Sequence, residues 1–465
     1  MITPRTIQDL VTHIRLHLEE EPEGVRAHLA DMPAPDIADL FNHLSLAEAA
    51  TVLTLVPFQT AVAVCELPTL RRRGPLMEQL DPKLAGQILE KMAADQRTNI
   101  IQKMGAHAHR RLLPLLSEAV QAEVQRLLQY KDRTAGSIMT TEFVQLTPDR
   151  TAEQALAHIR SVGRDKETIY ACYVLAPDTG KLLGAISLRD LVMAEPTQPV
   201  TQLMRPKPIT VRADESQESV AYKISKYNLL AVPVLEEDGR VVGFVTVDDV
   251  IDVMIEEQTE DVLRMGAVEP GALELPYMTT PLLTLVHKRG TWLVILFLSE
   301  MLTATAMGFF EAEIARAVVL ALFVPLVISS GGNSGSQAAT LIIRALSLRD
   351  VCLGDWWRVM RREVYSGLTL GGVLGVIGFL RIAVWSIFSD IYGPHWPLIG
   401  LTVGLALVGI VMWGSLSGSM LPFILKRFGL DPATSSAPFV ATLVDVTGLV
   451  IYFSVAMFVL RGTLL

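Results

Sequence analysis

Five long stretches in the second half of the chain are almost entirely apolar. They cover residues 291–310, 314–343, 364–388, 397–425 and 435–460. About 20 consecutive apolar residues are enough to cross the hydrocarbon core of a bilayer as a helix. Each stretch therefore predicts one membrane-spanning helix, and the second and fourth are long enough to tilt, bend or break.

Residues 1–130 show a different pattern, in which Leu, Ile and Val recur at spacings of three and four. Short segments of this kind, such as "DPKLAGQILEKM" and "DQRTNIIQKM", often begin with Pro or Asp, as helices do. This succession of short amphipathic helices predicts stacked helical hairpins, that is, an all-α superhelical domain.

An internal repeat follows between about residues 137 and 255. The segment "SIMTTEFVQLTPDRTAEQALAHIR" with "IYACYVLAPDTGKLLGAISLRDLV" aligns with "QLMRPKPITVRADESQESVAYKIS" and "LLAVPVLEEDGRVVGFVTVDDVI". Each copy predicts a strand, an amphipathic helix, an apolar strand, a turn with Gly180 or Gly239, a second strand and a helix. Strand pairs joined by a glycine turn and flanked by helices indicate two small α/β units.

The segment after the second repeat is strongly acidic. From Val241 to Leu263 it contains no Lys or Arg but carries seven acidic residues: Asp248, Asp249, Asp252, Glu256, Glu257, Glu260 and Asp261. On one helix, four of them would lie within an arc of roughly 80°, where like charges repel. A solvated acidic face is one interpretation. Since no basic partner is close in sequence, we favour a site for Mg²⁺ or Ca²⁺, which prefer oxygen ligands, acting as an electrostatic switch next to the membrane.

The distribution of charge supports this division of the chain. Residues 291–465 hold 10 Lys and Arg against 9 Asp and Glu, so residues 1–290 hold 30 against 40 and carry all of the net negative charge. An acidic soluble part argues against nucleic acid as a partner. Cys65, Cys172 and Cys352 form no CxxC pair, so neither a disulfide framework nor a zinc site is expected.

Basic residues predict the orientation of the spans, because Lys and Arg favour cytoplasmic loops. They precede the first span and separate the second from the third and the fourth from the fifth: Lys288, Arg289, Arg344, Arg349, Arg358, Arg361, Arg362, Lys426 and Arg427. The N-terminus has no long apolar segment of the kind found in signal peptides. We therefore expect a cytoplasmic soluble part, five crossings and a C-terminus outside.

Two polar features interrupt the apolar spans. The second span contains "VPLVISSGGNSGSQAATLII", whose glycines and polar residues either line a water-filled path or make a helix contact of small residues. The fifth contains Asp445, and a carboxylate at the bilayer centre costs about 2.5–3.5 kcal/mol. It is interpreted either as a pore carboxylate that attracts a cation, which we favour, or as a protonated, hydrogen-bonded side chain. Glu300 is a second intramembrane acid.

The order of these modules resembles the MgtE family of magnesium channels and transporters. The resemblance rests on the helical N domain, the tandem repeat, which is similar to a CBS pair, the acidic helix, and the motifs "GGNSGSQ", "DPA" and "DVTG" in the spans. It implies a multidomain membrane protein: an all-α superhelical N domain (1–132), an α/β tandem CBS pair (133–256), a connecting (plug) helix (257–282, beginning near 250) and a transmembrane pore domain of five helices (283–465).

The resemblance also implies function: a homodimer in the inner cell membrane and a Mg²⁺-selective channel that is shut by cytosolic Mg²⁺. The implied pore or selectivity residues are Asp445, Gly331, Gly332, Asn333, Gln337, Asp431, Ala437 and Thr447. Ala437 stands near a position where the family commonly has Asn, which leaves only a backbone carbonyl there. The implied Mg²⁺ sensor comprises the seven acidic residues of the connecting helix, and Asp95 is a further candidate in the N domain.

Adenine nucleotides are known ligands of CBS pairs, so ATP is a candidate ligand here. The alternatives to a Mg²⁺ channel are a coupled transporter for another divalent cation, such as Co²⁺ or Mn²⁺, and a membrane-anchored nucleotide sensor that transports nothing. The sequence shows no nucleophile–base pair, P-loop or metal-hydrolase motif, and we expect no enzymatic activity.

Overall fold

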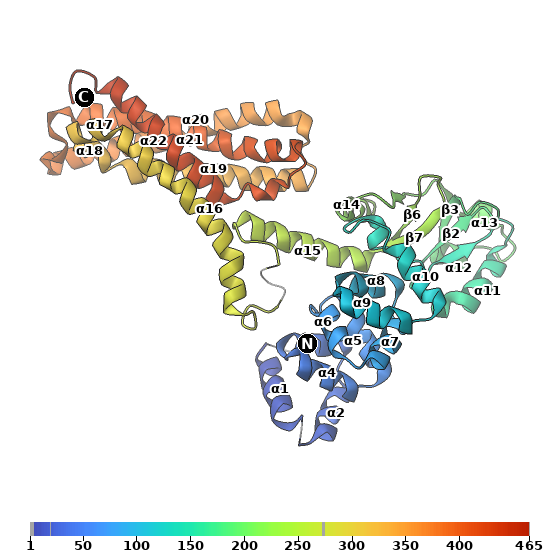
Figure 1. The fold of residues 1–465 in the computed structure, drawn as a ribbon. Coiled ribbons are helices and arrows are strands. Elements are labelled where there is room, and N and C mark those ends of the chain that lie inside the picture. Colours follow the sequence, from blue (N-terminus) through green and yellow to red (C-terminus); the bar gives the residue numbers. More distant parts are fainter. Residues whose placement is uncertain (1–3, 19, 272–274, 465) are drawn as a thin grey trace. The chain divides into compact units, whose positions relative to one another are not determined.

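The computed structural model describes residues 4–18, 20–271 and 275–464 (Figure 1). The chain forms two compact units, which meet within one helix: residues up to Glu257 belong to the first unit and residues from Gln258 onward to the second, apart from a short segment at 274–279 that belongs to the first.

The N-terminal part of the first unit consists of short helices, as predicted. These are α1 (Pro4–His17), α2 (Pro22–Ala30), α3 (Ala34–His43), α4 (Leu46–Leu55), α5 (Phe58–Glu66), α6 (Arg73–Gln79), α7 (Pro82–Lys91), α8 (Ala94–Lys103), α9 (Ala106–Leu112) and α10 (Glu118–Leu127). Polar caps start several of them: Ser45 and Glu48 form a capping box on α4, and Asp81 accepts hydrogen bonds from the first turn of α7.

These helices pack in a superhelix. From α1 to α10, each helix contacts the helix two places further along the chain, so that one continuous apolar core runs through the stack. A stack in which each element contacts its near neighbours is typical of helical repeat domains. The predicted all-α superhelical domain is confirmed.

The two repeats form two small sheets. The first has the strand order β1 (Val144–Leu146), β2 (Ala171–Leu175), β3 (Leu182–Ser187) and β4 (Arg205–Pro206), with α11 (Ala152–Val162), α12 (Leu188–Met193) and α13 (Val200–Leu203). The second has the order β5 (Val211–Arg212), β6 (Ala231–Leu235) and β7 (Val241–Thr246), with α14 (Gln217–Tyr227) and α15 (Val247–Met265). In each copy the first strand is parallel to the second, and the second and third are antiparallel.

The repeats are joined into one α/β pair. The rings of Phe143, Tyr173 and Phe244 lie with centroids about 6 Å apart and form a shared apolar cluster. The turn glycines Gly180 and Gly239 both have positive φ, the conformation that glycine adopts without strain. The predicted glycine turns are thus confirmed.

The acidic helix ends earlier than predicted. We expected a connecting helix that continues to residue 282, but α15 ends at Met265. Gly266, Ala267 with a positive φ, Pro270 and Gly271 follow, and the next helix begins only after Pro281. Glycine and proline disfavour helix interiors, so the composition of this segment explains the break.

The second unit contains five helical segments long and apolar enough to cross a membrane among the described residues. Its elements are α16 (Leu282–Phe309), α17 (Glu311–Arg316), α18 (Val318–Ala321), α19 (Val324–Ser347), α20 (Trp356–Phe388), α21 (Trp396–Arg427) and α22 (Ala437–Val459). Short 3₁₀ turns, including Leu353–Asp355, Asp390–His395 and Pro432–Thr434, connect them. The second span breaks before α19, as its length allowed.

Helix α21 is the centre of this unit and packs against α19, α20 and α22. Glycines allow the close approach. A Cβ added at Gly371 or Gly375 of α20 would lie 2.7 Å from backbone atoms of α21, and one at Gly335 of α19 would lie 2.9 Å from the carbonyl oxygen of Gly414. Small residues at such contacts let membrane helices pack by dispersion forces where no hydrophobic effect drives them together.

This packing gives a matched pair of substitutions on neighbouring residues. Gly371→Leu is expected to lower the thermal stability of the purified protein, because its Cβ would clash with Val408, and overpacking costs about 1–3 kcal/mol. Gly372→Leu is expected to have little effect, since nothing lies within 4 Å of a Cβ there. Thermal unfolding in detergent measures both, and equal loss of stability would contradict the assigned interface.

Candidate cation sites in the two units

Asp445 lies in the middle of α22 and is partly buried. Gly332 of α19 lies beside it, and a Cβ added there would lie 3.8 Å from the Asp445 Oδ1 atom. Gly332 is buried against Ala441 as well, so the glycine makes room for α22 at the level of the carboxylate. The small residue of "GGNSGSQ" and the acid of "DVTG" therefore adjoin one another.

Glu300 of α16 lies beside Asp445. Helices α16 and α22 pack together, and Phe310 stacks on Phe453 with ring centroids 5.0 Å apart. Both helices are expected to cross the membrane in the same direction. Glu300 precedes Phe310 by a helix length of roughly 15 Å, and Asp445 precedes Phe453 by roughly 12 Å, so the two acids lie at a similar depth. The two carboxyl groups are close enough to interact electrostatically.

The glycines of "GGNSGSQ" and its polar residues have separate roles. Gly331 is buried against Ile410 and Val444, and Gly335 against α21. The small-residue contact that we considered for this segment is therefore present. Asn333 and Gln337 instead lie on the exposed side of α19 in the single chain, four residues apart and hence on one helix face.

The remaining residues expected at the pore have intramolecular partners. Thr447 accepts a hydrogen bond from the indole Nε1 of Trp413 at 2.8 Å and donates one to the carbonyl of Leu443. The carbonyl oxygen of Ala437 accepts a hydrogen bond from the Ser336 hydroxyl at 3.1 Å. These bonds fix the start and middle of α22 against its neighbours.

Asp431 makes an ion pair with Arg264, near the end of α15, and accepts a hydrogen bond from the backbone of Ala433 at 2.8 Å. Arg264 also pairs with Glu260 one turn earlier on α15. The loop before α22 is therefore attached to the end of the acidic helix, within the second unit.

The first unit contains a group of acidic side chains that sequence spacing did not reveal. We call it the acidic cluster, and it joins the end of α5, the start of α8, the segments before β1 and β2, and the start of α15. Its members are Glu66, Asp95, Glu142, Glu167, Asp248 and Asp249. Asp95 was a candidate from the sequence, whereas Glu66, Glu142 and Glu167 lack any periodic signal and were missed.

Burial and mutual repulsion raise the pKa values in the acidic cluster. Burial is the largest cause for Asp95 and Asp249, and the charge of Asp95 raises the pKa of Asp249 further. For Glu167, burial together with the charges of Asp95 and Glu142 raises the pKa to about 7. The cluster thus holds more negative charge than its surroundings neutralise.

Hydrogen bonds satisfy the cluster only in part. Gln96 donates to Asp95 at 2.7 Å and to Asp249 at 3.4 Å, and the Thr246 hydroxyl also donates to Asp249. The Oδ1 atom of Asp95 is buried and has no hydrogen-bond partner within the described residues. A buried carboxylate oxygen without a donor is costly, and a bound cation or its water would satisfy it.

The acids further along α15 differ in their surroundings. The charge of Arg73 lowers the pKa of Asp252, although burial raises it more, and Arg73 also interacts with Glu256. Glu257 pairs with Arg133 and accepts a hydrogen bond from Gln217. Asp261 is partly buried on the same helix, in the second unit.

Arginines from distant segments therefore neutralise some of the acidic residues of α15, which have no basic partner nearby in sequence. Among the described residues, no group of three or more His, Cys, Asp or Glu side chains is arranged to ligate a metal directly. An ion bound by these acids would therefore be held through its water shell, as Mg²⁺ often is.

A cavity of about 340 Å³ lies between the two repeats in the first unit. Its lining includes polar side chains from both repeats, namely Glu167, Thr168, Tyr170, Thr246 and Asp248, together with the apolar residues Leu230, Ala231 and Val247. It shares Glu167 and Asp248 with the acidic cluster. A concave site with an apolar lining and a few polar groups is typical of small-molecule binding.

Comparison with known proteins gives matches along almost the whole chain. The model of the divalent cation transporter family MgtE matches residues 324–455, that of the MgtE intracellular N domain matches residues 32–133, and that of the CBS domain matches residues 135–196 and 200–256. A solved structure, the cytosolic domain of the Mg²⁺ channel MgtE in complex with ATP, aligns at 34% identity with a TM-score of 0.49, over 52% of this chain and 99% of that one.

Curated relatives extend the match over full-length proteins. The magnesium transporter MgtE of Thermus thermophilus is 39% identical over 447 residues, which are 96% of this chain and 97% of the relative. That of Enterococcus faecalis is 34% identical over 73% of this chain and 72% of the relative, and that of Bacillus subtilis is 28% identical over 98% of each. The resemblance inferred from the motifs is confirmed, and the chain belongs to the MgtE family of magnesium transporters.

Proposed function

We propose that the chain is a Mg²⁺-selective channel that mediates Mg²⁺ uptake across the cell membrane and is shut by cytosolic Mg²⁺. One observation carries the proposal: Asp445 and Glu300 bring two carboxyl groups together inside the membrane unit of a chain whose curated relatives are named magnesium transporters. The family consists of transporters, in agreement with our expectation that the chain is not an enzyme.

The exposed side of the spans supports a homodimer. Asn333, Gln337 and Glu300 are polar and exposed on helices of membrane-spanning length, and Glu300 belongs to a helix with no buried side chain in the described chain. Polar and charged groups in the membrane interior face other helices or a water-filled cavity. A second copy of the chain that meets this face would enclose them and bring two Asp445 side chains to one axis.

Such a pore is suited to a hydrated divalent cation. Asp445 is only partly buried, and Glu300 is adjacent, so two acids per subunit are available to water and ions in the proposed dimer. Mg²⁺ sheds its inner water shell reluctantly and is commonly bound by carboxylates through water. Selectivity would then depend on the size of the hydrated ion, because the acids contact its water molecules.

The acidic cluster is the proposed sensor. Repulsion among its carboxylates and the unpartnered Oδ1 atom of Asp95 fit a Mg²⁺ ion that is held through its waters. The cluster joins α5 and α8 of the N domain to the CBS pair and the start of α15, so a bound ion would draw these elements together. We extend the sensor from the connecting helix to include Glu66, Asp95, Glu142 and Glu167, and we give Glu257 and Glu260, which are paired with arginines, a lesser part.

ATP is a proposed ligand of the cavity between the repeats. A hydroxyl group from Thr168 and one from Thr246 line it, together with the Tyr170 ring and the Asp248 carboxylate. Tyr170 offers a surface on which a base can stack, and a carboxylate can accept hydrogen bonds from a ribose. Because the cavity shares acids with the acidic cluster, nucleotide phosphates bound there would add negative charge that Mg²⁺ neutralises.

The proposed orientation remains that of the positive-inside pattern, with the N-terminal unit in the cytoplasm and the C-terminus outside. The ends of α19 and α21 and the start of α20 carry the basic residues, which places this membrane face toward the cytoplasm. Accessibility of cysteines introduced after Leu460 to a membrane-impermeant reagent measures the orientation.

Growth of a bacterium that lacks its own magnesium uptake systems tests the proposed function. Expression of the chain is expected to restore growth at low external Mg²⁺, and patch recording of reconstituted protein is expected to show single-channel steps carried by Mg²⁺. Failure to restore growth by expressed, membrane-inserted protein would favour a nucleotide sensor that transports nothing. Currents that follow an imposed proton gradient, or transport of Co²⁺ or Mn²⁺ in preference to Mg²⁺, would favour a coupled transporter.

A further inference from the structure

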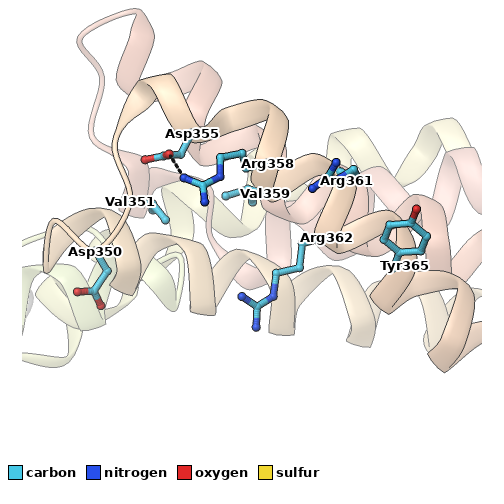
Figure 2. A pocket seen from close by; sticks show the side chains of 8 residues that line it. All are labelled: Asp350, Val351, Asp355, Arg358, Val359, Arg361, Arg362 and Tyr365. Carbon is cyan, nitrogen blue, oxygen red and sulfur yellow. Dashed lines mark hydrogen bonds and ion pairs between the residues drawn. The ribbon is translucent and has the colours of Figure 1, made fainter.

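An arginine-rich cavity lies at the start of α20, apart from the sites described above (Figure 2). It has a volume of about 720 Å³. Its lining comprises Asp350, Val351, Asp355, Arg358, Val359, Arg361, Arg362 and Tyr365. We call Arg358, Arg361, Arg362 and Tyr365 the arginine patch. Neither the proposed pore nor the proposed sensor uses any of these residues.

Two of the three arginines are not neutralised by an ion pair. Arg358 pairs with Asp355 at 3.5 Å, as Figure 2 shows. Arg361 and Arg362 are exposed and form no ion pair or hydrogen bond within the described part of the chain, although Arg362 interacts electrostatically with its neighbour Glu363. The patch is therefore a surface on which Arg361 and Arg362 carry positive charge without an ion pair in the described part of the chain.

The patch lies at the level of lipid headgroups. From Tyr365 to Phe388 helix α20 extends over roughly 36 Å with Arg381, near its far end, as its one charged residue, and this length exceeds the hydrocarbon thickness of about 30 Å. Arg361 and Arg362 precede this stretch by one turn. Trp356 and Trp357 lie exposed one further turn away, and aromatic residues of this kind are enriched at the membrane interface.

The surroundings keep the cavity in place at one face of the membrane unit. Val351 and Val359 pack against Ile342, Leu346 and Phe423, which are near the ends of α19 and α21. Lys426 of α21 donates a hydrogen bond to the carbonyl oxygen of Leu346 at 3.4 Å. Three helix ends are thus packed together beside the cavity, and each contributes basic residues to the same face.

We infer that the arginine patch binds the phosphate of an anionic phospholipid. Guanidinium groups bind phosphate with two parallel hydrogen bonds, and basic pockets between membrane helices are a known type of site for lipid headgroups. The Tyr365 hydroxyl can donate a further hydrogen bond. The acyl chains would follow the exposed apolar side of α20, which begins with Leu368 and continues through Val373 and Val376.

The acids in the cavity restrict the kind of headgroup. Asp350 and Asp355 lie at the end of the cavity away from Tyr365 (Figure 2) and would repel a second phosphate. They can accept hydrogen bonds from headgroup hydroxyls. A lipid with one phosphodiester and a hydroxylated headgroup, such as phosphatidylglycerol, fits both ends of the cavity.

The test uses the full-length protein in nanodiscs of phosphatidylcholine with increasing fractions of phosphatidylglycerol. Phosphatidylglycerol is expected to raise the thermal unfolding midpoint and to remain bound in native mass spectrometry. The double variant Arg361→Gln/Arg362→Gln is expected to bind this lipid at least about fivefold more weakly, because both guanidinium contacts with the phosphate are lost.

Matched variants separate the site from a general effect of charge. Arg316→Gln/Arg461→Gln removes the same charge from exposed residues that follow the first and fifth spans, and it is expected to keep the response of the native protein. Arg361→Lys/Arg362→Lys retains the charge and is expected to keep most of the response to phosphatidylglycerol. The inference is overturned if the double Gln variant responds to phosphatidylglycerol as the native protein does, or if inorganic phosphate alone gives the same stabilisation.

Discussion

Asp445→Asn is expected to abolish Mg²⁺-dependent growth rescue and to lower Mg²⁺ flux by at least about tenfold. A unit charge about 5 Å from a divalent ion contributes roughly 1.7 kcal/mol even in a medium as polar as water, and more where the dielectric constant is lower. Asn keeps the size and hydrogen-bonding capacity of the side chain, so that loss of flux would report the charge. Uptake of Mg²⁺ into proteoliposomes measures it directly.

Glu300→Gln is the natural comparison, because it removes a neighbouring carboxylate from a helix without buried side chains. We expect a smaller loss, about two- to fivefold, since Asp445 is then relieved of a repelling neighbour but still attracts the ion. Both variants must reach the membrane at native levels. Growth rescue by Asp445→Asn at the native rate would refute the assignment of Asp445 to the ion path.

The second large effect concerns regulation. Asp95→Asn/Asp249→Asn is expected to leave Mg²⁺ uptake active at internal Mg²⁺ concentrations at which the native protein is expected to shut. In digestion with trypsin, the Mg²⁺ concentration that protects the protein is expected to rise at least about tenfold. Removing two of the buried acids takes away ligands and also the repulsion that Mg²⁺ relieves. Without Mg²⁺ the variant should therefore be more resistant to trypsin than the native protein.

A control and a pH series make this test sharper. Asp178→Asn removes an exposed acid of the first unit, outside the acidic cluster, and should behave as the native protein does. Because the pKa of Glu167 is raised to about 7, protons compete with Mg²⁺ near neutrality, and less Mg²⁺ should be needed for protection at pH 8 than at pH 6. Unchanged shut-off in the double variant would refute the sensor.

The same digestion tests nucleotide binding. ATP at a fixed, subsaturating Mg²⁺ concentration is expected to increase protection of the native protein, and Tyr170→Ala is expected to reduce this increase, because the ring lines the cavity between the repeats. An identical digestion pattern with and without ATP would contradict a nucleotide site there.

The sequence predicted local structure and module order well. Periodic apolar positions identified the N-terminal helices, a repeated strand–helix pattern with Gly180 and Gly239 identified the paired α/β repeats, and five apolar runs identified the spans. Each of these elements is determined by neighbours in sequence. The end of α15 was predicted less well. We extended the acidic helix through a segment whose glycines and prolines end it at Met265.

Contacts between distant segments escaped prediction for a physical reason. Glu66, Glu142 and Glu167 occupy unrelated positions on separate elements, and only the packing of the N domain on the repeats collects them around Asp95. The partners of Asp431 and Glu257 are arginines more than a hundred residues away. Asp445 was found because one charge in a long apolar run is conspicuous without knowledge of any contact.

The break after α15 bears on how the proposed sensor could act on the proposed pore. Helix α15 ends at Met265 and the helix of the first span begins at Leu282, so the two are separate helices. An ion pair links the end of α15 to the segment before the fifth span. Arg264 pairs with Asp431, which lies fourteen residues before Asp445 on the segment that leads into α22. Displacement of the last turn of α15 would therefore act on the segment that leads into α22, the helix that carries Asp445.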